Sequence, residues 1–282
     1  MKFDPLQQII FDGLLKVYDN HLKLGEKGKL KDKQNRFGDM AMRADVEAEE
    51  ILLASLKNYS KESKTKLIYK GEEIGEGEIG EGEGQIFSVF DGLDGSSNYL
   101  AKSEFGYGTM IAVAKVNNPK YDDFIISGLA MMEEAKIIIT IKNDGVYVYD
   151  VKTKNFEKLK NFVVDEKFSD SKMLANKYFP EELTVYGDKP WVMTGSTAWS
   201  IFSICTDNKY CGLIEVTRKG NLEQPILYLM NTTLGGVMVD KNGNFIGSYD
   251  FKTWGQDEKL FLITAKNKNV AEDILKSTFK YK

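Results

Sequence analysis

The residues best suited to chemistry are Asp91 and Asp94, two carboxylates separated by Gly92 and Leu93. They follow the apolar run 86–90, which is predicted to be a buried strand. A bend at Gly92 would let both carboxylates and the carbonyl of Leu93 converge on one point. These are hard oxygen ligands, which suit Mg²⁺ or Mn²⁺ rather than Zn²⁺. The spacing therefore predicts a divalent-metal site at the end of this strand.

Small polar residues follow the second aspartate directly. Gly95 and Ser96 offer backbone N–H groups at the start of a predicted helix, where a phosphate can bind, and Ser97 and Asn98 come next. Metal ligands and an anion-binding turn would thus be contiguous. Taken alone, the segment 91–98 is more typical of an Asx turn after a strand, because Asp, Gly, Ser and Asn are turn formers.

Histidine and cysteine are too scarce for several classes of site. His21 is the only histidine, which excludes multi-histidine zinc sites, and its polar neighbours predict a place at the surface. The two cysteines, Cys205 and Cys211, cannot form a disulfide framework and are expected to be inert thiols. Any chemistry must therefore use carboxylates, hydroxyls and a metal.

The charge and hydropathy of the chain limit its partners. The formal net charge of -4 over 282 residues gives no reason to expect binding to nucleic acid or to an anionic membrane. No run of eighteen apolar residues occurs, and the N-terminus lacks a signal-peptide pattern. We therefore expect a cytoplasmic protein that acts on a small molecule.

The first half of the chain is predicted to form two helices that pack on the strands of one sheet. Asp4 and Pro5 are predicted to begin a helix that ends near Gly25, and Asp45 is predicted to cap a second helix that ends near residue 59. The segment 74–84 alternates Gly and Glu and is expected to be a mobile acidic loop. The remaining pattern indicates a largely antiparallel sheet, with strands at 67–70, 86–90, 107–116, 124–131, 136–142 and 146–149.

The second half has more helix relative to strand. Helices are predicted at 196–206, at 223–234 and at the C-terminus, and strands at 212–217, 237–240 and 260–265. The soft boundary between the halves, near 150–160, contains no long linker. We therefore expect an α+β or α/β protein of two tightly packed lobes. Residues 1–155 would carry most metal ligands, and residues 156–282 the substrate contacts and Glu223.

Several motifs in this order resemble the inositol monophosphatase and fructose-1,6-bisphosphatase superfamily. They are Asp45-Val46-Glu47-Ala48-Glu49, Gly71-Glu72-Glu73, the segment 91–98, Gly195-Ser196-Thr197-Ala198, Glu223 and Gly235-Gly236, so the resemblance spans most of the chain. The resemblance implies a layered αβαβα sandwich of the sugar-phosphatase type, with metals between the two lobes. It also implies a homo-oligomer, typically a dimer.

The resemblance also implies a ligand set for the metals. Glu72, Asp91 and the Leu93 carbonyl would hold a first Mg²⁺, and Asp91, Asp94 and Glu223 a second. A third Mg²⁺ is expected beside Glu72, and Mn²⁺ would suit the same ligands. Four carboxylates neutralise two divalent cations, whereas without metal they would repel one another strongly.

The mechanism implied by the resemblance is in-line attack on a phosphate ester by a metal-activated water. The catalytic residues would be Asp45 and Ser96, which match the acid–hydroxyl pair that positions this water, together with Glu72. Glu49 is expected to support the structure. The substrate-binding residues would be Gly95, Ser96, Ser97, Gly195, Ser196 and Glu215.

Departures from the family patterns leave the substrate open. Leu222-Glu223 stands where inositol monophosphatases usually carry Trp-Asp, and Glu223 is typical of fructose bisphosphatases, which are usually longer chains. Arg218 and Lys219 would either hold a second phosphate or form an exposed turn. We expect a lithium-sensitive phosphatase of an inositol or sugar monophosphate. Fructose 1,6-bisphosphatase activity is the alternative within this chemistry, and a non-catalytic regulatory protein is the alternative outside it.

Overall fold

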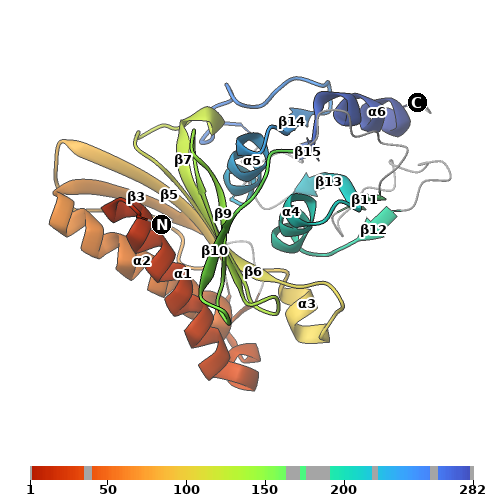
Figure 1. The fold of residues 1–282 in the computed structure, drawn as a ribbon. Coiled ribbons are helices and arrows are strands. Elements are labelled where there is room, and N and C mark those ends of the chain that lie inside the picture. The colour runs from red at the N-terminus through yellow and green to blue at the C-terminus, as the bar shows by residue number, and fades with distance from the viewer. Residues whose placement is uncertain are drawn as a thin grey trace.

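A computed structural model of the protein describes residues 2–34, 40–162, 172–175, 191–217, 222–254 and 260–279. Within these residues, helices and two large sheets stack as five layers, which Figure 1 shows in profile. Helices α1 and α2 cover one face of an eight-stranded sheet, and α4 and α5 cover its other face. The pair α4 and α5 also packs on a five-stranded sheet, whose far side carries α6. The predicted αβαβα sandwich is confirmed.

The eight-stranded sheet is antiparallel except where β3 lies parallel to β5. Most of its central strands are buried on both faces, as expected for a layer with helices above and below. In spatial order the strands are β10 (Asn155–Lys158), β9 (Gly145–Asp150), β8 (Lys136–Ile141), β7 (Phe124–Met131), β6 (Gly108–Ala114), β5 (Gly84–Asp94), β3 (Thr65–Gly71) and β4 (Glu76–Ile79).

The outer helices, α1 (Pro5–Leu24) and α2 (Arg43–Ser63), present apolar stripes to this sheet. At the start of α1, the Asp4 carboxylate accepts a hydrogen bond from the Gln7 N–H (2.8 Å), and the Gln7 side chain accepts one from the Asp4 N–H (3.0 Å). This capping box confirms the predicted helix start. Gly25 ends the helix with a positive φ of 49°, which confirms the predicted end.

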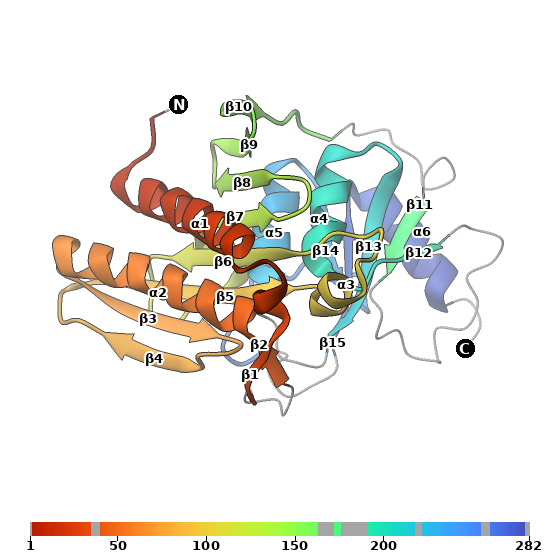
Figure 2. The same ribbon diagram turned by 90° about the horizontal axis from the view of Figure 1, so that it is seen from below.

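The remaining elements include the inner helix layer and the second sheet, which Figure 2 shows from below. The five-stranded sheet runs β12 (Trp191–Met193), β11 (Lys172–Ala175), β13 (Tyr210–Thr217), β15 (Leu260–Ala265) and β14 (Val237–Asp240). The helices are α3 (Ser96–Ala101), α4 (Thr197–Thr206), α5 (Gln224–Thr233) and α6 (Lys268–Phe279). A two-stranded ribbon, β1 (Lys31–Gln34) with β2 (Met40–Met42), and 3-10 turns at Gly25–Lys29 and Tyr121–Asp123 complete the described elements.

The Gly/Glu segment 74–84 is not the mobile loop that its composition predicts. Glu76–Ile79 forms β4, which pairs antiparallel with β3 from Leu67↔Ile79 to Lys70↔Glu76. Ile74 and Ile79 pack against the core beneath α1 and α2. The prediction of a loop was wrong because backbone pairing with β3 and the partial burial of two isoleucines offset the entropy cost of the glycines.

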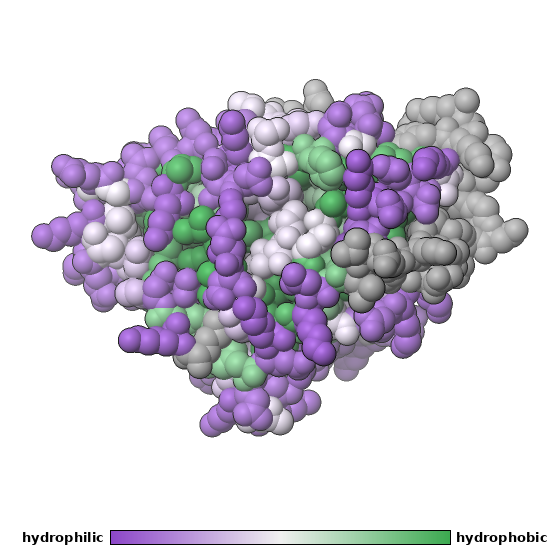
Figure 3. All heavy atoms as spheres, turned by 45° about the horizontal axis from the view of Figure 1, so that its top comes forward, coloured by the Kyte–Doolittle hydropathy of each residue, from purple (hydrophilic) through white to green (hydrophobic). Residues whose placement is uncertain are grey.

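Among the described residues, no helix is long and apolar enough to cross a membrane. Figure 3 shows polar and charged side chains spread over one face, with smaller apolar areas between them. Cys205 and Cys211 are free thiols, and Cys211 is fully buried.

Candidate metal centre

The motif that follows β5 is shaped by an irregularity in the sheet. Asp91 pairs with Met110 and Asp94 pairs with Gly108, so three steps along β5 match two steps along β6. Such a bulge bends the strand and redirects its side chains. The Leu93 N–H donates to Oδ1 of Asp91 at 2.9 Å, as in an Asx turn. The Asx turn and the bend that redirects the carboxylates therefore occur together in the segment 91–94.

Three carboxylates from distant parts of the chain meet at this bulge. Ligand oxygens of Glu72, Asp91 and Glu223 lie within 4.8 Å of one another. Glu72 directly follows β3, Asp91 lies in β5, and Glu223 is the residue immediately before α5. Parallel pairing of β3 with β5 brings the first two side chains to the same end of the sheet. The inner helix layer supplies the third.

Asp94 faces the start of α4 instead of lying in this trio. Its Oδ2 accepts hydrogen bonds from the Ser196 hydroxyl and from the Ala198 backbone N–H, each at 2.7 Å. Ser196 is also the N-cap of α4, because its hydroxyl accepts a hydrogen bond from the Trp199 N–H at 3.0 Å. A Cβ atom on Gly95 would lie 2.8 Å from that of Ser196, so the two motifs touch.

Crowding of negative charge marks the site. Burial raises the pKa of Asp91 well above its usual range, and the neighbouring Glu72, Asp94 and Glu223 raise it further. Burial raises the pKa of Asp94 to about 7, against the hydrogen bonds from α4 that lower it. Burial and the charge of Glu73 likewise raise the pKa of Asp45. Divalent cations would offset this repulsion, and the oxygen-only donor set fits Mg²⁺ or Mn²⁺.

Asp45 occupies the first turn of α2 and is not its N-cap. The helix begins at Arg43, and the Asp45 carboxylate reaches back to accept a hydrogen bond from the Met42 N–H at 3.2 Å. The prediction of an N-cap was therefore wrong: Asp45 is the third residue of the helix, and its carboxylate accepts the N–H of the N-cap residue Met42, as the acid at this position does in a capping box. Asp45 is 5% exposed and faces the acidic cluster, whose charges act on its pKa.

The expected phosphate-binding turn forms the start of the short helix α3. Gly95 precedes it with a positive φ of 87°, which glycine adopts without strain. The Ser96 hydroxyl donates to the Leu93 carbonyl at 3.3 Å, and Ser97 is exposed. Gly195, also at positive φ, leads into Ser196 at the edge of the same site.

Glu215 is enclosed by protein. It is 1% exposed, its Oε1 accepts a hydrogen bond from the Thr197 hydroxyl at 2.7 Å, and its Oε2 accepts one from the Gln224 side chain at 2.9 Å. The residue therefore braces the first turn of α4 against the first turn of α5. This arrangement supports a role in holding Glu223 and Ser196 in place.

Two residues behind the site support its backbone; the sequence predicted such a role for Glu49 but none for Asn98. Asn98 donates its amide to the carbonyls of Gly106 and Thr194, at 3.1 and 2.8 Å, and so ties α3 to the segment before α4. Glu49 is fully buried, and its carboxylate accepts hydrogen bonds from the turn that carries Glu72. Its position one helical turn after Asp45 is the signal in the sequence that both side chains share a face.

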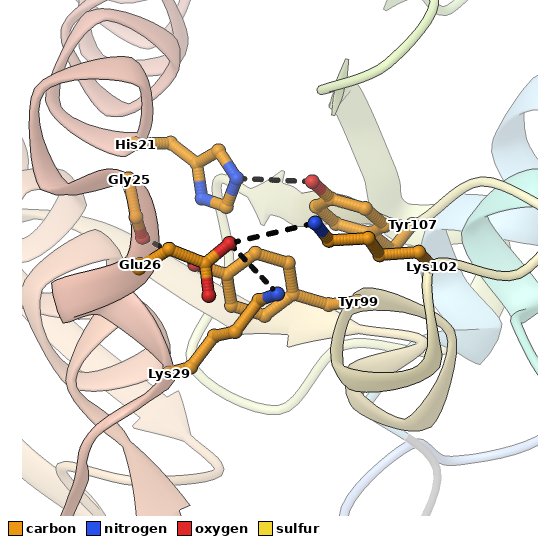
Figure 4. Close-up of polar contacts among 7 residues, drawn as sticks. All are labelled: His21, Gly25, Glu26, Lys29, Tyr99, Lys102 and Tyr107. Carbon is orange, nitrogen blue, oxygen red and sulfur yellow. Dashed lines mark hydrogen bonds and ion pairs between the residues drawn. The ribbon is translucent and has the colours of Figure 1, made fainter.

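His21 is not the surface residue that its neighbours predict. Figure 4 shows its ring beside Tyr99 and Tyr107, with the ring Nε2 3.1 Å from the Tyr107 hydroxyl. The Tyr99 hydroxyl donates to the Gly25 carbonyl at 3.0 Å. Glu26 contacts Lys29 and Lys102. This cluster fixes the end of α1 to α3, and burial lowers the pKa of His21 to about 4.

No protein-family model matches the sequence, and a search of curated protein sequences finds no significant match. Solved structures do match, over nearly the whole chain. A protein described as an inositol monophosphatase-fructose 1,6 bisphosphatase has 18% identity and a TM-score of 0.73, with 98% of this chain and 100% of that chain covered. The holo form of Leishmania major fructose-1,6-bisphosphatase has 17% identity and a TM-score of 0.71, with 98% and 94% covered.

A third solved structure, the Thermotoga maritima IMPase, has 13% identity and a TM-score of 0.70, with 96% of this chain and 95% of that chain covered. At these identities the likeness establishes the fold. The chain therefore has the fold of these phosphatases, as its motifs predict.

Proposed function

We propose that this chain, which has the fold of inositol monophosphatases and fructose-1,6-bisphosphatases, is a Mg²⁺-dependent phosphomonoesterase that acts on an inositol or sugar monophosphate. The observation that carries the proposal is the convergence of Glu72, Asp91 and Glu223 within 4.8 Å, at a bulge in the central sheet. Buried like charges are costly unless they are neutralised, and clusters of this kind are typical of functional sites.

The metal ligands proposed here are those that the resemblance to this superfamily implies. Glu72, Asp91 and the Leu93 carbonyl would hold one Mg²⁺, and Asp91, Asp94 and Glu223 a second, with a third beside Glu72. Mn²⁺ would suit the same oxygen atoms. The hydrogen bonds from Ser196 and Ala198 occupy Oδ2 of Asp94, so its Oδ1 is the atom proposed as ligand.

Bound ions would supply Lewis-acid chemistry: they polarise the phosphoryl group, activate a water and stabilise the leaving oxygen. The remaining roles belong to the chain itself. Asp45 and Ser96 are proposed to orient the attacking water, with Asp45 taking up its proton and Glu72 assisting. The N–H groups of Gly95, Ser96 and Ser97 are proposed to hold the phosphate, and Gly195 and Ser196 to line the substrate side.

Phosphate release from a panel of esters tests the proposal. We expect Mg²⁺-dependent turnover of inositol 1-phosphate or a related sugar phosphate, and inhibition by Li⁺. The Asp91→Asn variant, which removes a charge from the centre of the cluster, should release no phosphate while keeping the fold by circular dichroism. Unchanged turnover in this variant would overturn the assignment of the site. No turnover of any ester by the wild-type protein would favour a non-catalytic role.

Fructose 1,6-bisphosphate is the second candidate substrate, because Glu223 with Gly95-Ser96-Ser97-Asn98 resembles fructose bisphosphatases. The basic pair Arg218 and Lys219, which would hold a second phosphate, lies outside the described residues. Including fructose 1,6-bisphosphate and 3′-phosphoadenosine 5′-phosphate in the panel distinguishes the candidates by kcat/KM. A homodimer is part of the same proposal, and light scattering coupled to size-exclusion chromatography would test it.

A further inference from the structure

Glu49 is a buried carboxylate with no part in the proposed chemistry. It lies on α2, and its side chain is 0% exposed. Its Oε1 accepts a hydrogen bond from the Glu72 backbone N–H at 2.8 Å. Its Oε2 accepts one from the Glu73 N–H at 3.0 Å and one from the Ile74 N–H at 2.8 Å. Three consecutive peptide groups therefore converge on a single side chain.

These peptide groups belong to the turn between β3 and β4. The ladder between the two strands stops at Lys70↔Glu76, so the turn has few partners within the sheet. One backbone hydrogen bond closes it, from the Gly71 N–H to the Gly75 carbonyl at 2.8 Å. Glu49 accepts three hydrogen bonds from this turn, against the one that closes it, so Glu49 is the main restraint on the turn.

The packing leaves little freedom at this point. A Cβ atom on Gly71 would lie 2.5 Å from Oε2 of Glu49 and 2.7 Å from a ring carbon of Phe90. Glycine is thus required for the strand end to approach α2 so closely. The backbone immediately before Glu72 is therefore held between the helix and the core.

Glu49 is a carboxylic acid placed beside the acidic cluster, where burial raises its pKa to about 8. The carboxylates of Glu72 and Glu73 lie near enough to repel it. A neutral acceptor could accept hydrogen bonds from the turn without adding to the negative charge of the cluster. A further carboxylate becomes favourable when cations occupy the neighbouring site.

We propose that Glu49 is a positioning residue: it holds the backbone of Glu72 so that the Glu72 carboxylate stays in the cluster with Asp91 and Glu223. The inference rests on the proposed function, since positioning matters only if the cluster binds metal. Residues that orient metal ligands typically change metal affinity about 10–100-fold when they are substituted. The affinity for divalent ions is therefore the quantity to measure.

Calorimetric titration of the full chain with Mn²⁺ and Mg²⁺ tests the proposal without an activity assay. The Glu49→Gln variant keeps the size of the side chain and should bind the ions about 10–100-fold more weakly. The matched control is Glu50→Gln, which makes the same charge change at the adjacent, exposed position of α2 and should bind as wild type. Glu49→Asp, which keeps the charge but shortens the side chain, should fall between the two.

Thermal melting separates positioning from general stability. A merely structural role would lower the melting temperature of Glu49→Gln equally with and without metal. A positioning role would also reduce the difference between these two temperatures, which reports metal binding. Equal metal affinities in wild type and Glu49→Gln would overturn the positioning role and leave the proposed function standing. Absence of divalent-ion binding by the wild-type protein would instead overturn both.

Hydrogen exchange on the wild-type protein provides a test that does not depend on the folding of any variant. The amides of Glu72, Glu73 and Ile74 should exchange at least about 100-fold more slowly than in an unstructured peptide. Exchange at the unstructured rate in the otherwise folded protein would show that Glu49 does not hold the turn.

Discussion

The Ser196 hydroxyl donates a hydrogen bond of 2.7 Å to Oδ2 of Asp94, a residue 102 positions away in the sequence. The same oxygen accepts the Ala198 N–H, so Asp94 faces the positive end of the α4 dipole. These interactions oppose the rise in the pKa of Asp94 that burial causes. The start of α4 therefore favours the ionised form of a proposed metal ligand.

Replacing Ser196 with Ala should weaken metal binding and destabilise the protein. The variant loses the hydrogen bond to Asp94 and the N-cap of α4, and a lost cap costs about 1 kcal/mol. We expect the Mg²⁺ concentration for half-maximal activity to rise about tenfold. Thr206→Ala, at the exposed end of the same helix, is the control. A Mg²⁺ dependence identical to wild type would show that Asp94 does not require this hydrogen bond.

Asp91→Asn should abolish phosphate release and at the same time stabilise the metal-free protein. Its loss of charge removes repulsion from Glu72, Asp94 and Glu223, so the metal-free protein should gain about 1–2 kcal/mol in free energy of unfolding. Added Mg²⁺ should raise the melting temperature of the wild type but hardly that of the variant. Urea denaturation in EDTA measures the first effect. A variant less stable than wild type in EDTA would argue against electrostatic crowding at this position.

Gly92→Ala should be disruptive although the backbone there has no positive φ. A Cβ atom on Gly92 would lie 2.2 Å from the Asp45 carbonyl oxygen, so α2 and the bulge would have to separate. Overpacking of this kind typically costs about 1–3 kcal/mol, and it should also lower kcat. Gly13→Ala in α1 is the control, since its Cβ would lie 3.3 Å from the Ser55 hydroxyl and helix propensity favours alanine. Similar stability of the two variants would contradict the close contact at Gly92.

His21 should make the protein less stable in acid. Its folded-state pKa of about 4 lies below the ordinary 6.5, so between these values the unfolded chain binds a proton that the native state does not. Stability is fully present above pH 6.5 and falls as the pH approaches 4, by up to about 3 kcal/mol. His21→Phe removes this titration. As the pH falls from 6.5 to 4, the unfolding free energy of His21→Phe should therefore decrease less than that of the wild type. Parallel pH profiles of the two proteins would show that His21 is not held neutral.

Local signals in the sequence were sufficient for much of this protein. Helix α1 begins after Asp4 and ends at Gly25 as predicted, because caps act within one helical turn. The apolar runs 124–131 and 260–265 form β7 and β15 at the predicted positions. Asp91 and Asp94 could be identified as a pair because only two residues separate them, and the motifs around them predicted the layered fold.

Interactions between distant segments required the tertiary structure. The Glu76–Ile79 strand exists because β3 provides hydrogen-bond partners, and His21 is partly buried because Tyr99 and Tyr107 pack against it. Asp91 and Asp94 were local in sequence, but their pKa values depend on Glu72, Glu223 and Ser196, which reach them only through the pairing of β3 with β5 and the packing of α4 and α5 on the sheet. The sequence determines where the carboxylates stand in the chain. Their charge states depend on burial and on neighbouring charges, which are set only when the chain folds.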